Sequence, residues 1–270
     1  MCALVCECVD IVKTNISESH GPYINVFMHD NKIYICKYTK YMVVYRNKNR
    51  WETMWCSMIP LHTYMMASHP FLPFQLFYDN NKLIVYDTLN KINLACLDGI
   101  PYHNCEQIKY DAYGNYFLLN RYGLHFISNM FQYKKLDKKL ENARCFDIDL
   151  NKSILVCATT NYSIDLYQII YIDDKHAGVK LVPIVTLLDP EPINLFVVDI
   201  CISIKHNIII YVTHFHLVIL YDLSIPKKDH WKQKKINHYD IKKILLDVNK
   251  QFIYLFDSSH MFIYKYSFNQ

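Results

Sequence analysis

The sequence predicts an all-β fold: a single β-propeller of about six four-stranded blades, with seven blades as the alternative, over residues 1–270. Three observations predict it. The composition suits closely packed strands, short hairpins recur at a blade-like interval, and the chain begins with a strand that has no hairpin of its own.

The composition excludes a disordered chain and favours strands. Hydrophobic residues make up 52% of the chain and charged residues only 20%, with 23 Tyr and 14 Phe. A chain of 270 residues can bury enough apolar surface to be stable without a metal or a disulfide. Gly is scarce, at 5 residues, whereas Ile, Asn, Lys and Tyr abound, which indicates AT-rich codons such as those of a microsporidian or a large DNA virus.

Six segments share one pattern: a polar turn, a short apolar strand, a second polar turn and another strand. Asp and Asn favour such turns because their side chains bond the backbone two residues further on. The first strands of these hairpins start about 44 residues apart on average, and propeller blades recur every 40 to 45 residues or so. They begin near Ile33, Leu83, Tyr116, Ile154, Ile208 and Phe252.

One strand precedes most hairpins and a less regular one follows each, which gives four strands per blade. Residues 57–71 are expected to be a connector, because Pro60 and Pro70 limit any helix there to one or two turns. The predicted blades are residues 20–58, 73–105, 106–141, 142–190, 193–239, and 240–270 together with 2–13.

The two ends of the chain complete each other in this scheme. The last repeat supplies only three strands before Gln270, and the chain starts with the lone strand CALVCECVDIV. If this strand joins the last blade, the ring closes and no sheet edge is left open. Pairing of residues 2–12 with residues 261–268 is therefore the prediction on which the fold depends.

The turns also resemble those of WD40-type propellers. The pattern D-x-x-G/K-x-Φ-Φ, where Φ is apolar, occurs at residues 111–117, 149–155 and 247–253, and Tyr221-Asp222 stands where that family has Trp-Asp. The Gly-His dipeptide of the family is absent. The resemblance covers nearly the whole chain and implies a rigid docking surface without catalysis.

Metal ligands with a suitable spacing are lacking. His214 and His216 share one face of an extended segment, as a metal pair would, but no third ligand follows at a matching distance. Cys2, Cys6 and Cys8 likewise have no matching Cys or His set. We therefore expect no metal site and no cofactor.

Catalytic motifs are lacking as well. The sequence has no GxSxG and no Gly-rich phosphate loop. The acid pairs Asp147/Asp149 and Asp173/Asp174 fall on a strand end and a polar loop, respectively. We expect no enzyme activity, with an enzyme site at a central channel as the remote alternative.

The cysteines and the absence of targeting signals indicate the compartment. The 10 Cys show no disulfide spacing and are expected to be reduced and buried. Glu7 and Asp10 interrupt the opening apolar stretch, so it is not a signal peptide, and no run approaches a membrane span. We expect a cytoplasmic protein, or else a nuclear one, that is neither secreted nor bound to a membrane.

Positive charge gathers in three segments. Residues 227–243 carry seven Lys and two Asp, a net charge of +5 in a chain whose total is +4. Residues 46–50 and 134–144 are smaller basic segments, and aromatic residues lie among the cations. In the blade scheme these segments lie on outer strands and nearby loops, where Lys suits diffuse contact with a phosphate backbone.

The favoured hypothesis is a binding module, a monomer within its assembly, that docks onto a large ribonucleoprotein such as the ribosome and touches RNA. The candidate contacts are Arg46, Lys48, Arg50, Lys134, Lys135, Lys227, Lys228, Trp231, Lys232, Lys234 and Lys235. Alternatively, these cations only face solvent and guard edge strands.

The second hypothesis is a protein-only interaction scaffold. Its contacts would be aromatic residues at loop tips, namely Tyr38, Tyr41, Tyr122 and Phe215. Binding through such rings would tolerate salt and nuclease, whereas binding to RNA would not.

Overall fold

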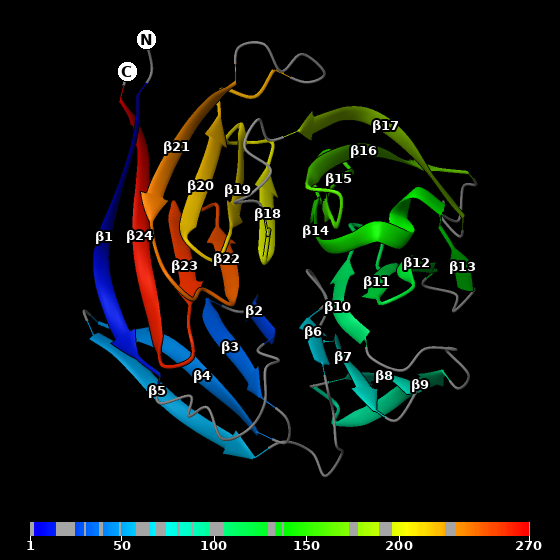
Figure 1. The fold of residues 1–270 in the computed structure, drawn as a ribbon. Helices are drawn as coiled ribbons and strands as arrows, with labels where there is room; N and C mark the ends of the chain where they lie inside the picture. Colours follow the sequence, from blue (N-terminus) through cyan, green and yellow to red (C-terminus); the bar gives the residue numbers. More distant parts are fainter. Residues whose placement is uncertain are drawn as a thin grey trace. The chain divides into compact units, whose positions relative to one another are not determined.

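The computed structural model describes residues 3–14, 25–29, 31–37, 40–48, 50–57, 65–68, 74–79, 82–87, 89–97, 105–128, 133–136, 138–172, 178–188, 196–224 and 231–269. These residues form strands β1 to β24 and one short 3-10 helix, η2 (Lys138–Asn142). The strands make six antiparallel sheets of four strands each within the described ranges (Figure 1). The chain divides into two compact units.

The first unit comprises Met1–Ser17, Asn142–Ile170 and Lys180–Gln270. Its first sheet contains β14 (Ala143–Asp149), β15 (Ile154–Thr159), β16 (Ser163–Tyr171) and β17 (Val179–Leu188). The next contains β18 (Asp199–Ser203), β19 (Ile208–Val212), β20 (His216–Tyr221) and β21 (Lys232–Asn237). The last contains β22 (Lys243–Asp247), β23 (Phe252–Phe256), β24 (His260–Asn269) and β1 (Ala3–Lys13).

The second unit comprises Glu18–Glu141 and Tyr171–Val179. Its first sheet contains β2 (Asn25–His29), β3 (Lys32–Lys37), β4 (Lys40–Asn47) and β5 (Arg50–Ser57). The next contains β6 (Met65–Ser68), β7 (Phe74–Asp79), β8 (Lys82–Asp87) and β9 (Ile92–Leu97). The third contains β10 (Cys105–Tyr110), β11 (Tyr116–Asn120), β12 (Gly123–Ile127) and β13 (Tyr133–Lys135).

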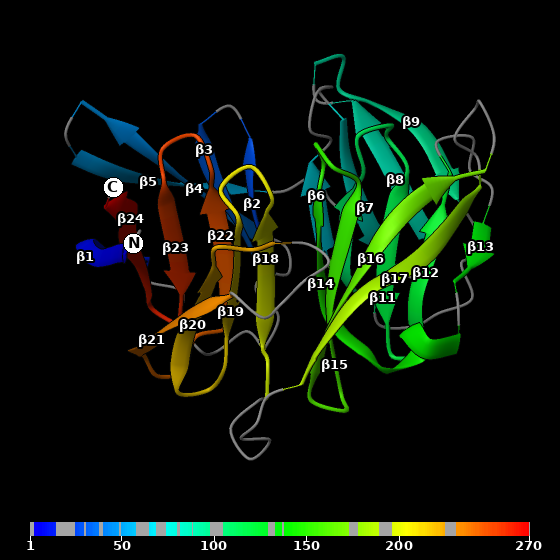
Figure 2. The ribbon, with the colours of Figure 1, turned by 90° about the horizontal axis from the view of Figure 1, so that it is seen from above.

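Neighbouring sheets meet through their first strands. In the first unit β18 lies against β14 and against β22 (Figure 2), and in the second unit β6 lies against β2 and β10. The first strand of each sheet is thus an inner strand, and the fourth strand is the outer one. Small antiparallel sheets packed in this way make a β-propeller, and the predicted all-β propeller class is confirmed.

The closing strand is where the sequence predicts it. β1 pairs antiparallel with β24 from Ala3 opposite Asn269 to Lys13 opposite His260, with a bulge between Cys8 and Asp10 (Figure 1). The backbone N–H of Thr14 continues the contact by donating to the carbonyl of Ser259 over 2.8 Å. The first strand of the chain therefore completes the last sheet.

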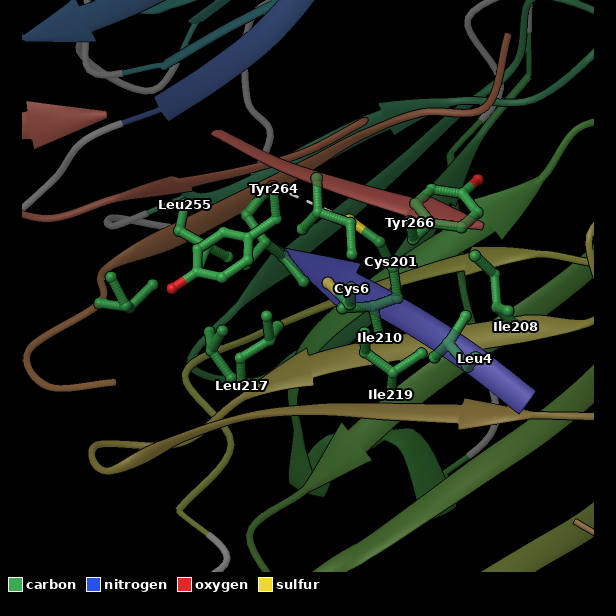
Figure 3. Packing of buried hydrophobic residues seen from close by; sticks show 14 residues of the cluster. Leu4, Cys6, Cys201, Ile208, Ile210, Leu217, Ile219, Leu255, Tyr264 and Tyr266 are labelled. Atoms are coloured by element: carbon green, nitrogen blue, oxygen red, sulfur yellow. Dashed lines mark hydrogen bonds between the residues drawn. The ribbon is translucent and has the colours of Figure 1, made fainter. Parts of the chain in front are cut away.

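Apolar packing holds this strand in place. The side chains of Leu4 and Cys6 are buried with Ile210, Ile219 and Tyr266, which come from β19, β20 and β24 (Figure 3). Burying one leucine of this kind stabilises the fold by about 2 kcal/mol. Burial also raises the pKa of the Cys6 thiol to about 12, so Cys6 is a protonated core residue.

The second predicted blade begins earlier than expected. Residues 57–71, read as a connector, contain β6, the inner strand of its sheet. The hairpin that follows Asp79 is consequently formed by the third and fourth strands, β8 and β9, and not by the second and third. Met65–Ser68 reads MMAS and has no β-branched or aromatic residue, so it carries no strand signal. The single domain over residues 1–270 stays a prediction.

Carboxylates join the inner strands of the first unit. Asp147 and Asp149 on β14 accept the backbone N–H groups of Ile202 and Ile204 over 3.0 and 2.7 Å. Asp199 on β18 accepts that of Ile244 on β22 over 3.0 Å. Since strands in neighbouring blades share no ladder, these charge-assisted bonds supply the polar link between them. The acid pair Asp147/Asp149 thereby has a structural task.

Three further features bear on the sequence predictions. Six cysteines whose side chains are described are free: Cys6, Cys8, Cys96, Cys145, Cys157 and Cys201. Within the described ranges, no group of three or more His, Cys, Asp or Glu side chains could hold a metal ion. His214 and His216 therefore belong to no such group. No helix in that part of the chain has the length and apolar character needed to cross a membrane.

Candidate functional site

The turns between second and third strands lie at one end of each sheet, together with the segments that lead into the next inner strand. In the first unit, side-chain oxygens at the end of the second strand cap these turns. Thr213 Oγ1 accepts the backbone N–H groups of Phe215 and His216 over 3.3 and 3.1 Å. Asp257 Oδ1 accepts those of Ser259 and His260, both over 2.6 Å. Capped turns hold their tip residues in fixed positions.

Phe215 is the tip residue of the β19–β20 turn, and its ring is 50% exposed. The ring of Tyr239, 68% exposed, stands edge-on to it, with the two centroids 6.3 Å apart. Backbone bonds join the two segments, since the N–H of His238 donates to the carbonyl of Phe215 over 2.9 Å and that of Asp240 to the carbonyl of His214 over 3.3 Å. Two exposed rings are thus held by a rigid backbone.

The row of rings continues toward β14 and β18. His214 lies parallel to Phe196, with ring centroids 5.4 Å apart. The guanidinium of Arg144 covers the ring of Phe196 at 3.2 Å from its centroid, and Phe196 stays 42% exposed. We call the five side chains Arg144, Phe196, His214, Phe215 and Tyr239 the aromatic ridge.

A second layer supports the ridge. The ring of His238 stands edge-on to Phe262 at 4.5 Å and lies 6.0 Å from Tyr264. Burial raises the pKa of the Tyr264 hydroxyl to about 12. The carboxylate of Asp257, which caps the β23–β24 turn, lies 3.4 Å from the imidazole of His260. These contacts connect the ridge to the sheet that β1 closes.

The ridge suits recognition by contact. Aromatic rings and Arg are enriched where protein interfaces bind most strongly, because they offer large rigid surfaces at a small entropic cost. The ridge combines four exposed rings with one cation, and backbone hydrogen bonds already join two of its segments. It can therefore bind without first having to order itself.

The loop-tip aromatics predicted from the sequence have different positions. Phe215 belongs to the ridge, and Tyr122 is 41% exposed at the β11–β12 turn of the second unit, with the guanidinium of Arg121 4.6 Å from its ring centroid. Tyr38 lies outside the described residues, and Tyr41 lies on β4, where its side chain is not described. Their role in binding stays a prediction.

Sequence reasoning missed Phe196 and Arg144 as partners of Phe215. Phe196 precedes β18, and Arg144 is the second residue of β14. No spacing rule links them to residue 215, because three separate segments meet in space. The only local signal was the polar residue before each tip, Thr213 for Phe215 and Asn120 for Tyr122.

The predicted basic residues that the structure describes lie on or beside outer strands. Arg46, Lys48 and Arg50 are exposed around the β4–β5 turn, where Lys48 has a φ of 53°. Trp231, beside β21, is half-buried and donates its Nε1–H to the carbonyl of Ser224 over 3.3 Å. Lys134 and Lys135 lie on β13, where their side chains are not described, and Lys227 and Lys228 lie outside the described residues.

The three lysines of β21 differ in what they contact. Lys232 forms an ion pair with Asp222 and lies 5.8 Å from the ring centroid of Tyr221. Lys234 donates from Nζ to the carbonyl of Leu4 on β1 over 3.1 Å. Lys235 is exposed. Two of the three predicted contacts thus have intramolecular partners, and Lys234 helps to hold the closing strand.

Comparisons with known proteins place the fold. No protein-family model and no curated protein sequence matches the chain. One chain in the crystal structure of a mitotic checkpoint complex is similar, with a TM-score of 0.63 and 8% sequence identity over 96% of this chain and 91% of that chain. In all, 1059 chains of solved structures match, so the likeness defines a widespread fold and not a particular partner.

The fold is that of a divergent WD40-like propeller. The similarity in structure, the D-x-x-G/K turns and the position of Tyr221-Asp222 at the end of a third strand agree on this point.

Proposed function

We propose that this chain is a non-catalytic protein-interaction module that binds a protein partner of a larger assembly through the aromatic ridge. The observation that carries the proposal is the pair Phe215 and Tyr239, which are both exposed although backbone hydrogen bonds join the two segments that carry them. Exposed rings with a fixed backbone are typical of interface hot spots. The similar chain from a mitotic checkpoint complex supports the proposal, since it too belongs to a multi-protein complex.

Structural tasks of the acidic residues favour a role without catalysis. Asp149, Asp199 and Asp257 each accept backbone N–H groups. A general acid or base needs a carboxyl group that faces a substrate instead. We place the protein in the cytoplasm, where free cysteines persist, as a monomer within its assembly.

The proposal predicts that ring removal abolishes partner capture without unfolding the protein. The tagged chain, the double variant Phe215→Ala/Tyr239→Ala and the control Lys250→Ala are expressed in the native cell, and captured proteins are quantified by mass spectrometry. Lys250 is exposed in the β22–β23 turn, at the opposite end of its sheet. We expect the double variant to retain less than about a tenth of the partner, because two hot-spot rings are worth several kcal/mol.

Nuclease treatment during the same capture separates protein from RNA contact. A protein partner stays bound after nuclease and at raised salt. Equal capture by the wild type and the double variant would overturn the proposal, and so would loss of all partners after nuclease.

A second candidate function is docking on a ribonucleoprotein such as the ribosome. It is favoured by the exposure of Arg46, Lys48 and Arg50 around a single hairpin turn, where they can contact successive phosphates. Glu52, in the same hairpin, accepts a hydrogen bond from Asn47 over 2.9 Å. A basic hairpin tip of this kind suits a phosphate backbone.

Charge reversal tests the second candidate. Arg46→Glu/Lys48→Glu/Arg50→Glu should reduce co-sedimentation with ribosomes and flatten its dependence on salt. Lys235→Glu is the matching change on β21, and Lys234 is left intact because it holds β1. Unchanged co-sedimentation of both variants would eliminate this candidate.

A further inference from the structure

His238 connects the parts of the aromatic ridge. Its backbone N–H donates to the carbonyl of Phe215, and the next residue, Tyr239, places its ring against that of Phe215. Its own half-buried ring stands edge-on to Phe262 and close to Tyr264 on β24. A displacement of the His238 ring therefore moves the segment that positions Tyr239.

The groups around this imidazole are mostly neutral or already paired. Asp257, on the β23–β24 turn, is the carboxylate that acts on it, and it is shared with the imidazole of His260 and two backbone N–H groups. Burial raises the pKa of the Tyr264 hydroxyl and that of the Cys6 thiol on β1 to about 12, so both groups are un-ionised at neutral pH. On the same segment Asp240 is paired with Lys242, and His214 and His216 belong to the adjoining turn.

Burial lowers the pKa of His238 from its ordinary value of 6.5, against the smaller opposing effects of a hydrogen bond with the Tyr239 backbone and of Asp257. The charged ring is thus disfavoured where it lies in the fold, whereas a displaced ring would ionise at its ordinary pKa. The ordered arrangement has its full stability above pH 6.5 and loses it as the pH falls through the lowered value.

We propose that His238 makes the aromatic ridge a pH-sensitive binding surface. Protonation drives the ring out from beside Phe262 and Tyr264, and the segment that carries Tyr239 then separates from Phe215. Acidification thereby releases the protein partner of the ridge. The release of a partner rests on the proposed function, whereas the separation of Tyr239 from Phe215 is a property of the chain alone.

Nuclear magnetic resonance on the free protein tests the movement. The imidazole signals of His238 and the cross-peak between the rings of Phe215 and Tyr239 are followed from pH 8 to pH 5. We expect His238 to titrate below pH 6.5 and the cross-peak to disappear with the same midpoint, while signals of the core residue Tyr254 stay unchanged. A cross-peak that persists after His238 is protonated would overturn the proposal.

Two variants separate this histidine from the others. In His238→Gln the cross-peak should no longer depend on pH, whereas His206→Gln should keep the wild-type response. His206 is a suitable control because burial also lowers its pKa, yet it lies in the β18–β19 turn at the opposite end, with Nδ1 2.6 Å from the Tyr266 hydroxyl. If His238→Gln does not fold, the wild-type titration still decides the question.

The failure of this proposal can be told from that of the proposed function. Partner capture by the wild type should be weaker at pH 5.5 than at pH 7.5, because burial lowers the pKa of His238, and capture by His238→Gln should be equal at both pH values. Capture that is strong but equal at both pH values overturns the pH sensitivity alone. A ridge that moves with pH in a protein that captures nothing overturns the proposed function and leaves the movement established.

Discussion

The two ends of the sheets in the first unit use the same turn chemistry for different purposes. At the β14–β15 turn, one oxygen of Asp149 accepts the N–H groups of Asn151 and Lys152, and the other accepts that of Ile204 in the neighbouring sheet. At the β23–β24 turn, Asp257 caps its own turn and leaves no bond to a neighbouring sheet among those described. One end binds the sheets together, and the other fixes loop tips.

The residues at the two ends of the sheets also differ in how far they are exposed. Asp149 is 5% exposed and Asp247, in the equivalent β22–β23 turn, only 2%, whereas Phe215 and Tyr239 at the other end are 50% and 68% exposed. Burying a carboxylate is costly unless its bonds are satisfied, so Asp149 depends on the backbone N–H groups that both of its oxygens accept. Exposing rings costs little stability, so the other end is free to serve binding. Stability and binding can therefore be altered separately in this molecule.

The largest effect on stability is expected for Asp149→Ala. The change removes the acceptor of three backbone N–H groups and should lower the free energy of unfolding by about 3 kcal/mol. Asp149→Asn keeps one oxygen for the turn and should lose about half as much. Urea denaturation followed by circular dichroism measures both losses. A loss below about 1 kcal/mol in the alanine variant would refute the role of this end in holding the sheets together.

A smaller effect is expected for Asp257→Ala at the opposite end. Only the cap of its own turn is lost, and the freed N–H groups of Ser259 and His260 can reach water, so the cost should be about 1 kcal/mol. The same denaturation experiment tests it. If Asp257→Ala costs as much as Asp149→Ala, the two ends do not differ as the comparison claims.

The smallest effect on stability is expected for Phe215→Ala. Its ring is half exposed, so the free energy of unfolding should change by no more than about 0.5 kcal/mol. Partner capture should nevertheless fall clearly in this single variant, which calorimetry and quantitative capture together would show. A large loss of stability would mean that the ring belongs to the core and is not displayed for binding.

The sequence predicts those parts of the fold that depend on local signals. The turns at Asp111, Asp149 and Asp247 could be recognised because an Asx turn needs only its own few residues, and in each the carboxylate accepts nearby N–H groups. The closing strand could be predicted because the last repeat is one strand short and the chain starts with a strand that belongs to no hairpin. β6 was missed because its four residues carry no strand signal.

The candidate site was only partly predictable, because it depends on tertiary contacts. Phe215 follows from its place at a turn tip, but its neighbours Phe196 and Tyr239 arrive from other loops. Lys234 reads as a surface cation, yet its ammonium group contacts Leu4, which lies 230 residues earlier in the chain. Pattern and charge indicate which residues are polar or apolar; they do not indicate which distant backbone a side chain reaches.

Site-specific crosslinking compares the two ends most directly. A photo-reactive amino acid is placed at position 215 in one variant and at position 250, in the β22–β23 turn, in another, and both are irradiated in the native cell. The account predicts a nuclease-resistant crosslink to a protein from position 215 and none from position 250. A crosslink from position 250 alone, or one to RNA from position 215, would contradict it.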